Sequence, residues 1–247
     1  MHNIYYHDIK TTFTTICPSL EYPEKKSTIT KQRQVLSPPG LTVIAKIGEK
    51  EEQPFKEAAT KIQNRSGKRF CSNKSLHFTL LGLLNDERKS SQFYRNKIVS
   101  STREFIKRKH FGHMKINFNL IRLGAFFSHG EPCNNSSDGT LIAMADSGSE
   151  EVNKFNILGD DLACHLRKSF PIIFYPNIDL RLKREHPTVW CILGYFNETD
   201  FEIDQKLVLV LEDLKSFNAA VTVSQLEVRS YQIRSLENSH LVTKISL

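Results

Sequence analysis

Apolar and polar residues alternate along several stretches of this chain, and such alternation predicts β-strands. Successive side chains of a strand point to opposite faces, so each stretch is expected to bury one face and expose the other. β-branched and aromatic residues, which favour strands, are frequent in the same stretches. The segments concerned are 41–47, 75–84, 115–127, 140–145, 180–196, 220–233 and 241–247.

Other stretches carry apolar residues at intervals of three and four, which predicts helices. In the last of them Ile203, Leu207, Val210, Leu211 and Leu214 fall on one helical face. The predicted helices cover 53–63, 87–109, 150–168 and 200–217. Residues 128–139 hold Gly, Pro, Asn and Ser, so they are predicted to form a hairpin loop.

The first 38 residues differ from the rest of the chain. They are rich in Thr, Ser, Lys and Pro and show no sustained period, which predicts an extended or partly ordered N-terminal arm. Residues 39–247 then form a single α+β domain in this interpretation. At 247 residues the chain is long enough to bury a large core.

Two short motifs lie at matching places in this order of elements. His77-Phe78-Thr79 opens one strand and His186-Pro187-Thr188 lies on another, and each strand is followed by a predicted helix and two strands. This order predicts an internal duplication. On a strand His77 and Thr79 share one face, while Phe78 points to the other.

The chemistry of these residue types suits a phosphodiester. Histidine has an ordinary pKa of about 6.5, so one imidazole can act as a general base and a second, protonated one as a general acid. The Thr79 and Thr188 hydroxyls can donate hydrogen bonds to phosphate oxygens, and this chemistry requires no metal. The sequence leaves open which of His77 and His186 is the base.

The paired motifs resemble the H-x-[S/T]-x signatures of the two-histidine (2H) phosphoesterase superfamily, which includes the RNA 2′,3′-cyclic phosphodiesterases. The resemblance covers residues 41–247 and implies a bilobal fold, in which two pseudo-symmetric lobes turn antiparallel sheets towards a central cleft and carry helices outside. It also implies metal-independent cleavage without a cofactor, with His77 and His186 catalytic. Pro187 has no N–H group, so its strand is expected to be at an edge or bulge there.

The net charge of the chain indicates what kind of partner it binds. The chain has 34 basic and 27 acidic residues, a net charge of +7, which favours an anionic partner such as RNA or a nucleotide over a neutral one. A generally basic surface without a ligand is the alternative. Arg184 and Trp190 share the parity of His186 and are candidate substrate contacts, and Tyr231 is a third. A rim charge and a core Trp are the competing interpretations of the first two.

The cysteines, the lengths of the apolar runs and the N-terminus indicate the setting in which the protein works. Five scattered cysteines without a C-x-x-C pair predict neither a metal site nor a disulfide framework, and a reduced cytoplasmic setting is expected. No apolar run is long enough to span a membrane, no signal peptide is evident, and a monomer is the default expectation.

Two alternatives to an RNA-end phosphodiesterase remain: a non-catalytic module that binds phosphate or RNA ends, and an enzyme for a non-RNA cyclic phosphate.

Overall fold

A computed structural model describes residues 39–84, 92–128, 131–171, 189–196, 204–232, 236 and 239–247. For residues 92, 124–128 and 131–138 it describes the backbone only. The N-terminal arm predicted for residues 1–38 lies outside the described residues.

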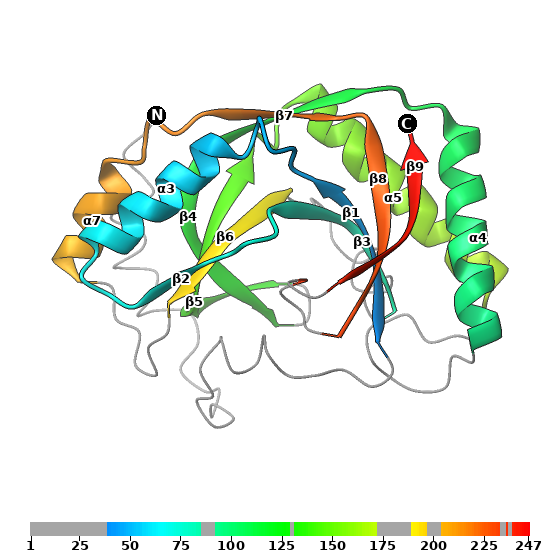
Figure 1. Ribbon diagram of the computed structural model, residues 1–247, viewed down its shortest axis with the longest axis horizontal. Helices are drawn as coiled ribbons and strands as arrows, with labels where there is room; N and C mark the ends of the chain where they lie inside the picture. Colours follow the sequence, from blue (N-terminus) through cyan, green and yellow to red (C-terminus); the bar gives the residue numbers. More distant parts are fainter. Residues whose placement is uncertain are drawn as a thin grey trace.

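A single, strongly curled antiparallel sheet forms the centre of the molecule (Figure 1). Eight strands follow one another in the order β7-β4-β5-β6-β3-β1-β8-β9, and β2 pairs with β6 beside this path. The strands are β1 (Gly40–Lys46), β2 (Phe70–Ser72), β3 (His77–Leu84), β4 (Met114–Ser128), β5 (Glu131–Ala145), β6 (Trp190–Phe196), β7 (Ala219–Val223), β8 (Gln225–Tyr231) and β9 (His240–Ser246).

The sheet has two halves that meet at its middle. One half has the order β3-β1-β8-β9 and the other β6-β5-β4-β7, and the halves are joined where Phe78 on β3 pairs with Cys191 on β6. The predicted α+β class with antiparallel strands is therefore confirmed. β3, the strand of the first motif, lies at the junction of the two halves.

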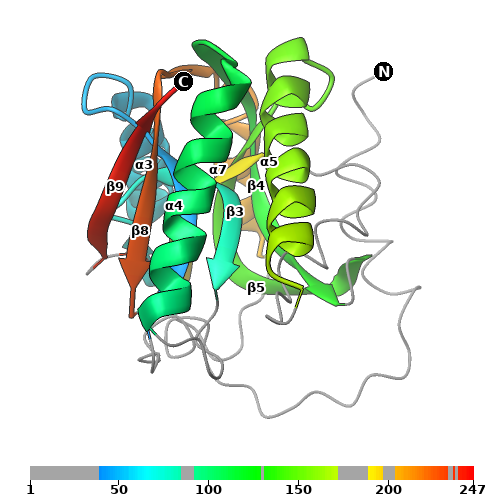
Figure 2. The same cartoon turned by 90° about the vertical axis from the view of Figure 1, so that its right-hand side faces the viewer.

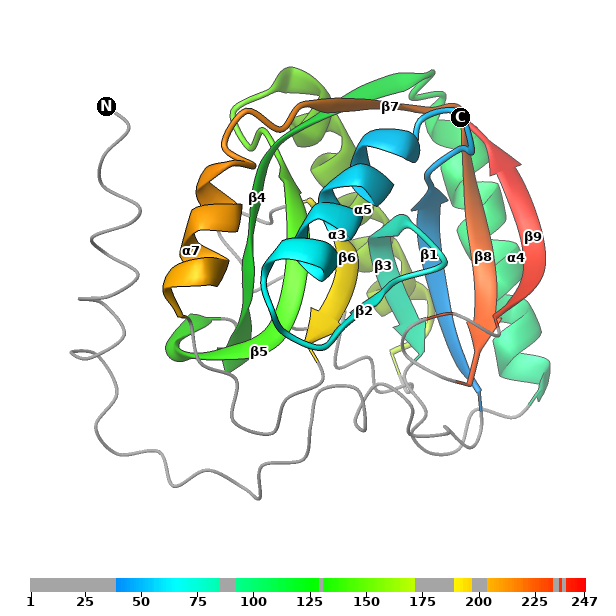
Figure 3. The same cartoon turned by 60° about the vertical axis from the view of Figure 1, so that its left-hand side comes forward.

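Four helices within the described residues pack as two pairs. α4 (Gln92–Lys109) lies beside α5 (Glu150–Ser169) in Figure 2, and α3 (Gln53–Arg65) lies near α7 (Gln205–Glu212) in Figure 3. α5 begins where the Ser149 hydroxyl accepts a hydrogen bond from the Val152 N–H, and α7 where Asp204 does the same for Leu207. None of these helices is both long and apolar enough to cross a membrane.

A chain of buried phenylalanines joins the sheet to the helices. The Phe78 ring on β3 lies 5.4 Å from Phe118 on β4 and 5.2 Å from Phe155 on α5, measured between ring centroids. Phe118 in turn lies 5.3 Å from Phe55 on α3. Phe78 thus points into the core beneath the helices, so the alternation of the strand turns its neighbours His77 and Thr79 to the opposite face.

Two sequence-based expectations were wrong. The hairpin loop expected over 128–139 is mostly strand, because β5 begins at Glu131 and pairs with β4 as far as Ser128. Backbone pairing needs no apolar residues, so a polar sequence did not prevent it.

The strand expected over 220–233 is in fact two strands that separate at Ser224. β7 pairs with β4 and β8 pairs with β1, so the two strands lie in opposite halves of the sheet. The buried positions shift from Val221 and Val223 to Leu226 and Val228, and that change from odd to even numbers was the available signal.

Candidate active site

His77, at the start of β3, has one ring nitrogen held by the backbone. Its Nδ1 atom lies 2.6 Å from the carbonyl oxygen of Ser75. A carbonyl oxygen can only accept a hydrogen bond, so Nδ1 carries the proton of the neutral ring. The Nε2 atom of neutral His77 therefore keeps a lone pair that can accept a proton.

The surroundings of this half-buried ring favour its neutral form. Burial lowers the pKa of His77 below its ordinary value of 6.5, and the positive charge of Arg229 lowers it further. The hydrogen bond to Ser75 acts in the opposite direction but does not cancel the decrease in pKa. At neutral pH His77 therefore has the protonation state of a general base.

Thr79 shares the face of His77 and is exposed. Thr79 pairs with Ile44 on the neighbouring strand β1. Phe78, which lies between His77 and Thr79 in the sequence, is buried in the core. The Thr79 hydroxyl is thus accessible on the same side of the sheet as the His77 ring. It can donate a hydrogen bond to an anionic ligand there.

An anchored arginine lies on this same face, on β8. Arg229 pairs across the sheet with Thr42, and Glu227 pairs with Ile44. The Arg229 Nε donates to the Ser239 hydroxyl at 2.8 Å, one terminal nitrogen donates to the Ser239 carbonyl at 3.1 Å, and the other donates to Glu227 Oε2 at 2.5 Å. A guanidinium has five N–H groups, so two have no partner among the described residues.

From the sequence Arg229 is only a weaker candidate for a phosphate contact than Arg184, and its pairing with Glu227 is not predicted. The sequence contained a signal for this pair, because the charged Glu227 and Arg229 alternate with the apolar Leu226 and Val228 along one strand. The charged side chains must then lie together on the opposite face.

Cys191 lies next to His77 across the junction of β3 and β6. Burial raises the pKa of its thiol to about 12, although a hydrogen bond from the His77 backbone acts against the increase. The thiol is therefore protonated at neutral pH and is not a nucleophile for His77 to activate.

Within the described residues, no three His, Cys, Asp or Glu side chains gather in a way that could hold a metal ion.

Two predicted substrate contacts can be located. Trp190 begins β6 and is half-buried, and it precedes Cys191, which shares the core face of Phe78, so Trp190 lies on the face of His77. Tyr231 also shares this face but is only 7% exposed and packs with Ile44 and Leu236. Its stacking role stays a prediction and requires these neighbours to move.

The other predicted residues cannot be located. His186, Thr188 and Arg184, together with Pro187, lie outside the described residues. Their roles stay predictions from the sequence.

Comparison with known proteins supports the fold. No protein-family model matches the sequence, and no curated protein matches it. Among solved structures, TT0787 of Thermus thermophilus is similar with a TM-score of 0.54 and 14% identity, over 84% of this chain and 97% of that one. E. coli LigT complexed with NADP+ gives a TM-score of 0.50 and 11% identity, over 85% of this chain and 98% of LigT. The chain therefore has the fold of the 2H phosphoesterases.

Proposed function

We propose that this protein is a metal-independent phosphodiesterase that acts on 2′,3′-cyclic phosphates or phosphodiester ends of RNA or nucleotides. The observation that carries the proposal is the state of His77, whose Nδ1–H is held by Ser75 and whose pKa is lowered. The fold supports the class of substrate, because E. coli LigT, which has the same fold, was solved with the nucleotide NADP+ bound.

The proposed reaction begins with His77 as the base. Its Nε2 atom removes a proton from water as the water oxygen attacks phosphorus. The bond from phosphorus to one ribose oxygen breaks, and that oxygen takes a proton from His186, which acts as the acid. Water is thereby added across one P–O bond, and no redox partner is needed.

The remaining groups stabilise charge on the phosphate. Thr79 and Thr188 donate hydrogen bonds to its non-bridging oxygens, and Arg229 supplies a fixed positive charge near His77. Because Glu227 and Ser239 already hold the guanidinium, little reorganisation is needed when substrate binds. Arg184, Trp190 and Tyr231 are the proposed contacts to the rest of the substrate.

The position of the second motif along the chain supports the roles proposed for His186 and Thr188. His186 precedes Trp190 by four residues and Thr188 precedes it by two. Trp190 is the first residue of β6, the strand that meets β3 beside Phe78. Chain connectivity therefore limits how far the second motif can lie from His77.

A product assay tests the proposal. The protein is incubated with EDTA and a panel of 2′,3′-cyclic nucleotides, an RNA oligonucleotide ending in a cyclic phosphate, and a non-nucleoside sugar cyclic phosphate, and products are separated by chromatography. We expect phosphomonoester from the nucleotides and the RNA. Hydrolysis of the sugar phosphate alone would assign a different substrate. A rise in the thermal midpoint without any product would identify a binding module.

A further inference from the structure

One helix of the protein has a large excess of basic over acidic residues. α4 carries six basic residues against one acidic residue, Glu104, a net charge of +5 within a chain whose net charge is +7. The basic residues are Arg95, Lys97, Arg103, Lys107, Arg108 and Lys109. Such a concentration attracts polyanions.

Apart from the buried Arg95, the basic residues of α4 are exposed on the outside of the helix. Ile98 and Ile106 of α4 are buried in the same core as Phe78, so α4 covers the face of the sheet opposite to His77. The side chains that point outward are exposed and follow one another at helical spacing. They are Phe93, Lys97, Ser100, Arg103 and Lys107, which we call the α4 outer stripe. At 1.5 Å per residue this stripe is about 21 Å long.

Most of this charge is not neutralised by neighbouring acids. Lys109, at the end of the helix, donates to Asp161 of α5 at 2.5 Å. Lys97, Arg103 and Lys107 have no ion-pair partner within the described part of the chain. These three cations are therefore available to a ligand.

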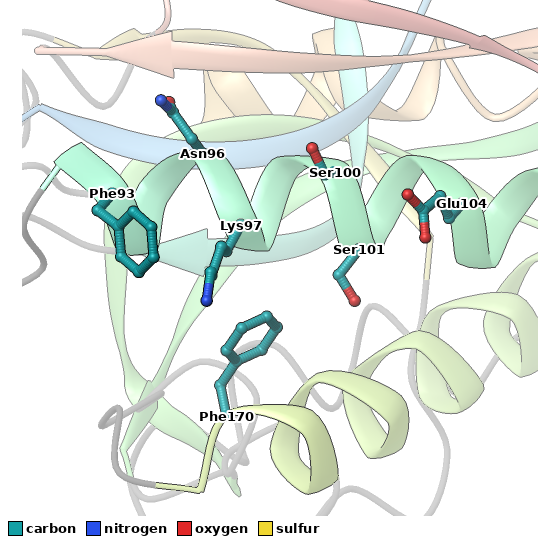
Figure 4. Close-up of a pocket in the computed structure, with 7 residues that line it drawn as sticks. All are labelled: Phe93, Asn96, Lys97, Ser100, Ser101, Glu104 and Phe170. Carbon is teal, nitrogen blue, oxygen red and sulfur yellow. The ribbon is translucent and has the colours of Figure 1, made fainter.

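A groove of about 360 Å³ opens at the N-terminal end of the stripe, between α4 and the end of α5. Phe93 is 59% exposed, and the Lys97 ammonium lies 4.3 Å from the centre of its ring. Figure 4 shows Lys97 reaching from α4 towards the Phe170 ring on the other side. The remaining lining residues are polar: Asn96, Ser100, Ser101 and Glu104.

A second exposed aromatic ring adds to this apolar surface. Tyr94 is 41% exposed and packs edge-to-face on Phe93, with the ring centroids 5.8 Å apart. Exposed aromatic rings beside lysines are typical of sites that bind single-stranded nucleic acid, since rings stack on bases while cations contact phosphates.

We propose that the α4 outer stripe and its groove bind single-stranded nucleic acid. Phe93 and Phe170 contact a base in the groove, and Lys97, Arg103 and Lys107 contact successive phosphates along the helix. The choice of RNA as the natural strand rests on the proposed function, but binding itself does not depend on turnover. Because α4 and His77 are on opposite faces of the sheet, this is a site separate from the catalytic one.

The test is fluorescence anisotropy with a labelled single-stranded RNA of about 12 nucleotides that ends in a free 3′-hydroxyl. The Lys97→Gln/Arg103→Gln/Lys107→Gln variant is compared with Lys50→Gln/Lys115→Gln/Lys206→Gln, which removes the same charge from exposed positions elsewhere. We expect the stripe variant to weaken binding at least tenfold and to reduce the salt slope by about 2, since each single-strand phosphate contact contributes about 0.7. Phe93→Ala should weaken binding at least about fivefold.

Three outcomes would overturn the proposal: equal losses in the stripe and control variants, equal affinity for duplex and single-stranded RNA, or equal affinity for an acidic polypeptide. Thermal midpoints confirm that the variants fold. Turnover of a mononucleotide 2′,3′-cyclic phosphate, measured in parallel, should be unchanged in the stripe variant. If the wild type turns over no substrate but anisotropy depends on the stripe, the proposed function fails while the binding site stands.

Discussion

The Nδ1 atom of His77 lies 2.6 Å from the carbonyl oxygen of Ser75, two residues earlier in the chain. This short contact determines which nitrogen of the neutral ring holds the proton. It leaves Nε2 as the only atom of the ring that can accept one. A half-buried ring of low pKa, fixed in this tautomer, is suited to be a base rather than an acid.

Removing the charge of Arg229 should shift the pH dependence of the reaction. That charge lowers the pKa of His77, so its loss raises the pKa, and His77 then becomes protonated at higher pH. The acidic limb of the profile of kcat/KM against pH should therefore move to higher pH in Glu227→Gln/Arg229→Gln. The reference is Glu227→Gln, which keeps Arg229, because removing Arg229 alone would leave the buried Glu227 carboxylate with only the longer ion pair to Lys244, at 3.7 Å. An unmoved acidic limb would show that Arg229 does not act on His77.

Cys191 should be dispensable for catalysis. Its buried thiol has a pKa of about 12 and is protonated at working pH. We expect Cys191→Ala to keep the wild-type kcat within about threefold, and a thiol-alkylating reagent to leave the folded enzyme active. Loss of activity at an unchanged thermal midpoint would contradict this assignment.

Phe78 should be one of the most important residues for stability. It is 1% exposed and contacts Phe118 and Phe155, so Phe78→Ala should reduce the free energy of unfolding by about 3–5 kcal/mol in urea titrations. Phe93→Ala, on the surface of α4, is the matched control and should change stability by no more than about 0.5 kcal/mol. Similar effects of the two substitutions would contradict the described core.

Gly194 allows β2 to approach β6 closely. A Cβ atom at this position would lie 2.3 Å from Cζ of Phe70 and 2.5 Å from the carbonyl oxygen of Cys71. Gly194→Ala should therefore cost about 1–3 kcal/mol of stability. In Gly48→Ala the nearest atom is a carboxylate oxygen of Glu51 at 3.4 Å, so this control should be close to neutral. A neutral Gly194→Ala would show that β2 does not dock as described.

The sequence predicted much of the fold because its core strands alternate regularly. The separation of His77 and Thr79 from Phe78 follows from strand geometry alone. The tautomer and the lowered pKa of His77 could not be predicted in this way. Arg229 lies 152 positions further along the chain, and only the register of β3, β1 and β8 brings its charge near His77. The alternation within a strand sets the face of each side chain, but it does not tell which strands from distant parts of the chain are neighbours.

The most direct test of the central claim is kcat/KM for a 2′,3′-cyclic nucleotide in three single variants. His77→Ala and His186→Ala should each lower it by at least about 10²-fold at an unchanged thermal midpoint, because each removes one partner of the acid–base pair. His240→Ala, an exposed histidine on β9, should leave it unchanged. Wild-type rates in both His77→Ala and His186→Ala would contradict the account.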